Sequence, residues 1–210
     1  MNILALETSV PHASLCLYKD GEFCCQADWQ ALRNHDAYLF PALQQAMDML
    51  DGAPLDLVLV GAGPGSYGGV RVALAAGVGI SMVRKCPLVA VPSWDQLAKD
   101  GTCIVSDARR GGWTLRRPNG SITVITPQEL SNLLDGGARV YTVEDEPTMR
   151  KAGMHAARYG LCPTARGVVE TWLTLDAAAR AELAAKPAEP IYVRPPHITE
   201  AHRKPWETAR

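Results

Sequence analysis

The first thirty residues alternate between short apolar runs and polar turns, a pattern typical of β-strands. Residues 2–6, 13–17 and 22–27 each have the length and composition of a strand. Lys19, Asp20 and Gly21 form a turn signal between the second run and the third. The chain is therefore predicted to open with an antiparallel meander.

The next segment has the periodicity of an amphipathic helix. Asn34 is a candidate N-cap, and Gly52 and Pro54 end the segment. Between them, apolar residues recur three and four positions apart: Leu39, Leu43, Ala46, Met47 and Leu50.

A continuous apolar run at residues 57–60 predicts a strand buried on both faces. It leads directly into a glycine-rich loop, residues 61–69, and a second helix is expected from Val70 to about Arg84. This helix carries small residues that favour tight packing, namely Ala73, Ala75, Ala76, Gly77 and Gly79. Residues 88–91 predict another buried strand, after which Ser93 is expected to cap a short helix through Ala98.

Strands are expected again at residues 103–106, 113–116 and 122–125, with helices after Pro127 and from about residue 168 to 185. The strand-rich opening of residues 102–125 echoes the start of the chain and suggests a duplicated α/β fold. We predict a first lobe at residues 1–98, a smaller second lobe at 99–188 and a tail at 189–210.

Composition is that of an ordinary globular protein, with 47% hydrophobic residues and a formal net charge of −1. Any contact with RNA must therefore depend on a local basic patch. Glu7 interrupts the first apolar run, which is too short for a signal peptide or a membrane span, so a cytoplasmic protein with no membrane contact is expected. Six cysteines without C-x-x-C spacing predict free thiols, with Cys24 and Cys25 on opposite faces of a strand.

The glycine loop is the strongest local motif, because a strand, a glycine-rich turn and a helix start can present backbone N–H groups to an anion. No Gly-Lys-Ser/Thr follows, which excludes a Walker A loop, and Pro64 excludes a nucleophile elbow around Ser66. Residues 63–68 match G-x-G-x-x-G, but no acidic residue ends the next strand, so dinucleotide binding is disfavoured. A phosphate site and a tight structural turn both remain open.

Polar residues at two strand ends complete a hypothetical nucleotide cleft. Glu7, Thr8 and Ser9 follow the first strand, and Asp107 follows the first strand of the second lobe. With Gly63, Gly65 and Ser66 these residues are candidates to hold ATP or ADP with magnesium, although Thr8 and Ser9 are also ordinary turn formers.

No complete catalytic or metal site is visible. The five histidines never form H-x-x-x-H, and no Ser-His-Asp or Cys-His set is anchored to a motif. An enzyme using Glu7, Ser66 and Asp107, either a small ATPase or a metallopeptidase, is kept as the alternative hypothesis.

The order of these motifs resembles the TsaB (YeaZ) family. The resemblance rests on residues 3–9, on His35 with Leu39, and on residues 63–71, 89–93, 107–109 and 189–194. It implies the two-lobed fold of actin, Hsp70 and sugar kinases (ASKHA). It also implies a non-catalytic paralogue of TsaD, because residues 92–97 lack the two histidines of the TsaD metal site. Glu7, Tyr67 and Gly68 depart from the usual family residues, which argues against nucleotide binding.

The resemblance further implies partners for threonylcarbamoyladenosine formation in tRNA. These are a TsaD-like catalytic subunit bound through helices of the first lobe, a TsaE-like ATPase, and tRNA through the complex. A homodimer of the isolated chain through the same helices is also expected. The candidate interface residues, which core packing explains equally well, are His35, Leu39, Leu43, Met47, Val70, Leu74 and Val78. A third hypothesis places tRNA on the basic residues of the tail, Arg194, Arg203 and Lys204, against the alternative of a solvated tail.

Overall fold

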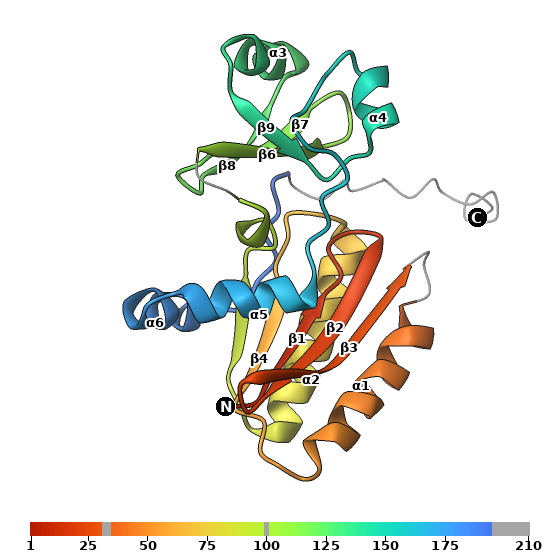
Figure 1. Ribbon diagram of the computed structural model, residues 1–210, viewed down its shortest axis with the longest axis vertical. Helices are drawn as coiled ribbons and strands as arrows, with labels where there is room; N and C mark the ends of the chain where they lie inside the picture. Colours follow the sequence, from red (N-terminus) through yellow and green to blue (C-terminus); the bar gives the residue numbers. More distant parts are fainter. Residues whose placement is uncertain (31–34, 99–100, 195–210) are drawn as a thin grey trace, which may run out of the picture.

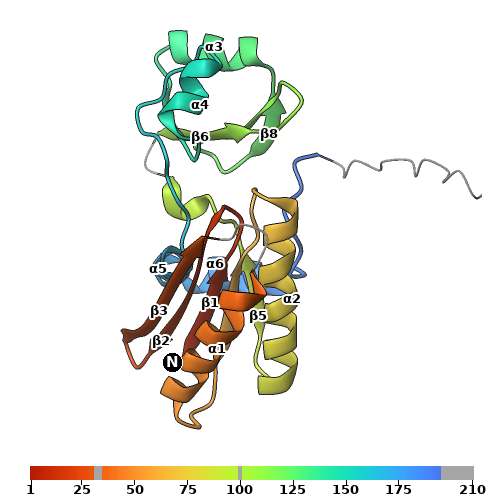
Figure 2. The same cartoon turned by 90° about the vertical axis from the view of Figure 1, so that its right-hand side faces the viewer.

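The computed structural model describes residues 1–30, 35–98 and 101–194. They form two α/β lobes that follow one another along the long axis of the molecule (Figures 1 and 2). Each lobe contains one mixed sheet, and the larger sheet has the strand order β3-β2-β1-β4-β5.

The larger sheet confirms the predicted meander. β1 pairs antiparallel with β2, and β2 pairs antiparallel with β3, whereas β1, β4 and β5 run parallel. The strands are β1 (Ile3–Glu7), β2 (His12–Lys19), β3 (Glu22–Gln30), β4 (Leu57–Gly61) and β5 (Leu88–Val91).

Helices cover both faces of this sheet, which explains why its parallel strands are apolar throughout. Leu4 and Leu6 of β1 face α1 (Asp36–Leu50) and α2 (Tyr67–Arg84). Ile3 and Ala5 face the opposite layer, which contains α5 (Ala165–Thr174) and α6 (Ala177–Ala185). The chain thus returns from the second lobe to complete the first, so α5 and α6 do not pack with the lobe to which the sequence analysis assigned them.

The second lobe contains a sheet of order β8-β7-β6-β9. Leu115, Leu130 and Met149 are fully buried in its core. β9 and α4 were not predicted from the sequence. The elements of this lobe are β6 (Thr102–Asp107), β7 (Trp113–Arg116), β8 (Ile122–Ile125), α3 (Pro127–Asp135), β9 (Arg139–Thr142) and α4 (Glu146–Lys151).

Two local predictions differ from the structure, and a third is not tested by it. The single helix expected over residues 168–185 is two helices, because Leu175 is extended and Asp176 caps α6. Ser93 does not cap the short helix η1 (Asp95–Leu97), which begins after Trp94. Asn34, the predicted cap of the first helix, lies outside the described residues.

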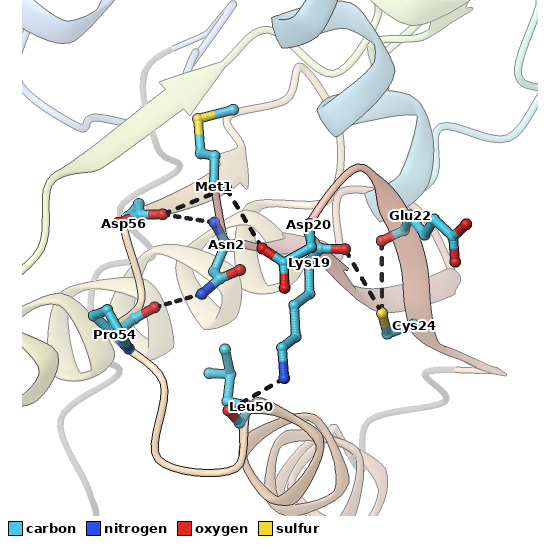
Figure 3. Close-up of polar contacts among 9 residues, drawn as sticks. All are labelled: Met1, Asn2, Lys19, Asp20, Glu22, Cys24, Leu50, Pro54 and Asp56. Carbon is cyan, nitrogen blue, oxygen red and sulfur yellow. Dashed lines mark hydrogen bonds and ion pairs between the residues drawn. The ribbon is translucent and has the colours of Figure 1, made fainter.

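Polar contacts fix the start of β1 at the end of the sheet away from the second lobe (Figure 3). The backbone N–H of Asn2 donates to Asp56 Oδ2 at 2.7 Å, and its side chain donates to the carbonyl of Pro54 at 2.8 Å. Lys19 Nζ lies 3.1 Å from the carbonyl of Met49 at the end of α1. With this end anchored, residues 7–9 are held at the opposite end of β1.

The cysteine prediction is confirmed where the structure tests it. All six thiols are free, Cys25 is buried, and Cys24 on the other face of β3 is exposed. No helix in the described part of the chain has both the length and the hydropathy of a membrane span.

Candidate functional site

The glycine loop packs directly against the end of β1. Thr8 Oγ1 donates to the carbonyl of Gly69 at 2.6 Å, and the N–H of Ser66 donates to the carbonyl of Ser9 at 2.6 Å. A Cβ atom on Gly65 would collide with the Ser9 carbonyl, and one on Gly69 would collide with the Thr8 carbonyl. The glycines therefore serve this close backbone approach.

Several loop amides already have acceptors within the protein. Gly63 N–H donates to Ser93 Oγ at 2.9 Å, Ser66 N–H to the Ser9 carbonyl, and Gly69 N–H to Ser66 Oγ at 3.3 Å. Ser66 is thus the N-cap of α2, and Ser93 supports the loop. A phosphate bound through these three amides would have to displace protein hydrogen bonds, so the local geometry favours the structural-turn interpretation.

Glu7 lies beneath the loop with no exposed surface. Its Oε1 accepts from Ser9 N–H at 2.7 Å, while its Oε2 is buried without a hydrogen-bond partner among the described residues. The carboxyl group also occupies the space that a side chain on Gly61 would need. Burial raises the pKa of Glu7, and polar interactions with Ser93, then Ser9 and Thr8, only partly oppose this.

Asp107 makes its contacts within the second lobe. Its backbone N–H donates to Glu144 Oε1 at 3.0 Å, and its own Oδ1 accepts from Arg109 N–H at 2.7 Å. The structure therefore brings Ser9 into contact with Gly65 and Ser66, whereas Gly63 is bonded to Ser93 and Asp107 is engaged elsewhere. Among the described residues, no three His, Cys, Asp or Glu side chains are grouped so that they could hold a metal ion.

A large apolar groove lies between α1 and α2, with a volume of about 920 Å³. On the α1 side it is lined by four of the predicted interface residues, His35, Leu39, Leu43 and Met47. Leu39 is only 3% exposed and also contributes to the core. Polar groups mark the rims, with Asp36 on α1 and Arg84 near the end of α2.

The α2 side of the groove differs from the prediction. Val70 and Leu74 are 2% and 7% exposed and pack into the core beneath α2, so they are not available to a partner. Val78 is 44% exposed but does not line the groove. The α2 lining consists of Val72, Ala75, Ala76, Gly79, Ile80, Val83 and Arg84.

The most exposed apolar side chains of the groove region were missed by sequence reasoning. Phe40 and Val83 line the groove and are 64% and 80% exposed, and Met82, outside the groove lining, is 74% exposed. The signal was present, because these residues lie outside the buried stripes of their helices. An apolar residue at such a position points to a surface that another molecule covers.

Of the three basic tail residues proposed to contact tRNA, the structure describes only Arg194. Arg194 Nη1 donates to the carbonyl of Arg109 at 2.9 Å, which ties the end of the described chain to the second lobe. Arg203 and Lys204 lie outside the described residues.

The chain is similar in sequence to proteins of tRNA modification. The model of TsaD, tRNA N6-adenosine threonylcarbamoyltransferase, matches residues 29–129. The TsaB proteins of tRNA threonylcarbamoyladenosine biosynthesis from Bacillus subtilis and Escherichia coli are 31% identical over 119 residues and 25% identical over 127 residues. These alignments cover 53% and 60% of this chain, and the chain spans about half the length of the two relatives, 52% and 48%.

The structural comparison covers more of the molecule. YeaZ from Pseudomonas aeruginosa superimposes with a TM-score of 0.69 at 24% identity, covering 91% of this chain and 99% of that one. This similarity establishes the fold, and the two mixed sheets with their helices agree with the predicted ASKHA architecture. Together with the sequence relatives, it makes the chain similar in sequence and in fold to the TsaB (YeaZ) proteins.

Proposed function

We propose that this chain is an accessory subunit in the formation of threonylcarbamoyladenosine in tRNA, and that it binds a TsaD-like catalytic subunit through the groove between α1 and α2. The observation that carries the proposal is the exposed apolar surface of this groove. The pathway is inferred from the names of the relatives, and the binding surface is inferred from the groove.

The groove offers a substantial hydrophobic driving force. Removing a large apolar side chain from water stabilises a complex by roughly 1.5–3 kcal/mol. Phe40 and Val83, which line the groove, are each more than half exposed in the free chain. Small residues, Ala75, Ala76 and Gly79, form part of the α2 wall, which leaves room for side chains of a partner helix.

The geometry of the glycine loop supports an accessory role rather than nucleotide chemistry. The amides of Gly63, Ser66 and Gly69 have protein acceptors, and Glu7 is fully buried. In this proposal a TsaD-like subunit performs the transfer. A TsaE-like ATPase, ATP or ADP with magnesium, and tRNA join at the level of the complex.

The same groove provides a surface for self-association of the isolated chain. A two-fold dimer would place one apolar groove against its copy and would be displaced by the catalytic subunit. Light scattering of the isolated chain at micromolar concentration measures this directly.

Val83→Glu tests the proposal by introducing a charge into the groove at an exposed position of α2. We expect the variant to lose co-elution with its TsaD-like partner and to lower threonylcarbamoyladenosine formation by the reconstituted complex. The reason is that an unpaired carboxylate buried in an apolar interface is costly. Ala184→Glu is the matched control, because Ala184 is an exposed residue of α6 outside the groove.

Two results would contradict this function. One is unchanged association and activity of the Val83→Glu complex. The other is transfer activity of the wild-type chain alone, which would assign catalysis to this subunit.

A further inference from the structure

A short segment of the chain after α6, residues 191–194 (the crossing segment), contacts both lobes. The backbone N–H of Ile191 donates to the carbonyl of Ala62 in the glycine loop at 2.8 Å. Arg194 then donates to the carbonyl of Arg109 in the turn between β6 and β7. Figure 2 shows this segment passing beside the first turn of α2 and toward the second lobe.

This segment contributes one ring of a stacked and partly exposed aromatic pair. Tyr192 lies on Tyr67 with ring centroids 4.9 Å apart and an interplanar angle of 28°. The two residues remain 44% and 47% exposed. The guanidinium group of Arg71 lies 5.2 Å from the centre of the Tyr67 ring. A surface with exposed ring faces and a cation beside them suits the stacking of a planar base.

Two further arginines extend this surface onto the second lobe. The side chain of Arg109 is 87% exposed, and Arg110 is exposed beside it. Asp107 lies 3.7 Å from Arg109 and offsets part of the positive charge, while the Asp107 backbone is bonded to Glu144. Arg71, Arg109 and Arg110 still give a local excess of positive charge on a chain with a net charge of −1.

The backbone that presents these arginines is strained. Arg109 and Arg110 have φ values of 61° and 50°, so two successive residues with side chains adopt the left-handed conformation. Each such residue costs roughly 1–2 kcal/mol relative to a right-handed one. The turn is held by hydrogen bonds to the Arg109 carbonyl from Gly112 N–H and from Arg194. Strain that is kept in place by the surrounding structure is a feature of functional surfaces.

We propose that Tyr67, Arg71, Arg109, Arg110 and Tyr192, here called the Tyr–Arg strip, bind an unpaired segment of RNA. A base stacks on the tyrosine pair, and the arginines contact the flanking phosphates. The strip is exposed and combines π faces with guanidinium groups, a combination that favours a flexible polynucleotide over an acidic peptide. The identification of this RNA as a tRNA loop rests on the function proposed above.

Fluorescence anisotropy of the isolated full chain with a labelled tRNA anticodon stem-loop tests the strip. Tyr192→Ala should weaken binding by about tenfold, since a base–aromatic stack is lost, whereas Tyr192→Phe should retain the wild-type affinity. Arg109→Gln combined with Arg110→Gln should lower the magnitude of the salt slope by about 1.4, because two phosphate contacts are removed. Arg150→Gln is the control, as Arg150 is an exposed arginine of α4 that pairs with Glu146 outside the strip.

Several outcomes would overturn the proposal. One is a wild-type affinity weaker than about 10⁻⁴ M, the limit of nonspecific binding. Another is equal affinity of the strip variants and Arg150→Gln. Loss of TsaD-like subunit binding in the strip variants, with RNA binding unchanged, would make the strip a protein interface. Val83→Glu should leave RNA binding intact, so failure of the groove proposal and failure of this one give different results.

Discussion

Glu7 shows how a single side chain can change the interpretation of a motif. At the level of the sequence, an acidic residue after the first strand predicted a ligand for magnesium or phosphate. In the structure the carboxyl group is fully buried, and Ser9 N–H is bonded to one of its oxygens. A solvent-borne ligand has no access to this group without movement of the loop. In this conformation Glu7 therefore affects the stability of the fold and does not bind a ligand from solvent.

Replacing Glu7 should alter the pH dependence of stability. Because burial raises the pKa of Glu7 in the folded state above its ordinary value of 4.5, the folded chain holds this proton more tightly than the unfolded chain. The stability due to this group is complete below pH 4.5 and is lost as the pH rises through the folded-state pKa. Each unit of difference is equivalent to about 1.4 kcal/mol. Glu7→Gln should therefore flatten the decline in the free energy of unfolding between acid and neutral pH.

Urea unfolding of the wild type and Glu7→Gln over this range of pH measures the effect. Glu182→Gln serves as the control, because Glu182 is exposed on α6 and its pKa is lowered by Lys186. Parallel stability curves for the wild type and Glu7→Gln would show that Glu7 titrates alike in the folded and unfolded chain.

At the scale of elements, the sequence predicted the helix α2 but not which of its faces packs into the core and which lines the groove. Its small residues predicted close contact, and Gly77 indeed packs on β4 and β5. The helix is apolar around most of its circumference, so the sequence pattern did not distinguish the stripe of Val70 and Leu74 from the groove lining. Only the positions of α1 and the sheet decide which stripe is buried. The same limit applies to the second lobe, where short β9 and α4 have too few residues for a periodic signal.

Two glycines of α2 provide a matched test of this packing. A Cβ atom on Gly77 would lie 2.7 Å from Val60 and 2.9 Å from Leu88, whereas one on Gly79 would meet nothing within 4 Å. Gly77→Ala should lower the free energy of unfolding by about 1–3 kcal/mol through overpacking. Gly79→Ala should raise it by up to about 1 kcal/mol, since alanine is the better helix former. Urea unfolding gives both values, and changes of the same sign would contradict the packing described for α2.

On the scale of the whole molecule, several contacts join the lobes besides the crossing segment. Trp94 is buried against Ile104 and Tyr141. Arg116 of β7 donates to Asp95 Oδ1 of η1 at 2.7 and 2.9 Å. The two-lobed fold was predictable because the family motifs follow one another along the chain. The return of α5 to the first sheet was not predictable, since its apolar face would suit either lobe.

Nucleotide binding is the property on which this architecture and the enzyme hypothesis disagree. The amide of Ser66 is bonded to Ser9 and the amide of Gly63 to Ser93, and the hydrogen bond from Ile191 to Ala62 lies next to them. Since these groups belong to the first lobe, motion of the second lobe would not release them. The isolated chain should therefore show no saturable binding of magnesium-ATP.

Isothermal titration of the wild type, Asp107→Asn and Ile191→Pro with magnesium-ATP, together with a phosphate-release assay, tests this expectation. Asp107→Asn removes the acid that the enzyme hypothesis needs, and Ile191→Pro removes the N–H that fastens the crossing segment to Ala62. All three should give no binding and no hydrolysis, because the loop amides stay engaged. Binding by Ile191→Pro alone would show that the crossing segment, rather than the engaged amides, excludes the nucleotide. Wild-type hydrolysis that is lost in Asp107→Asn would instead establish a catalytic cleft and contradict the accessory role.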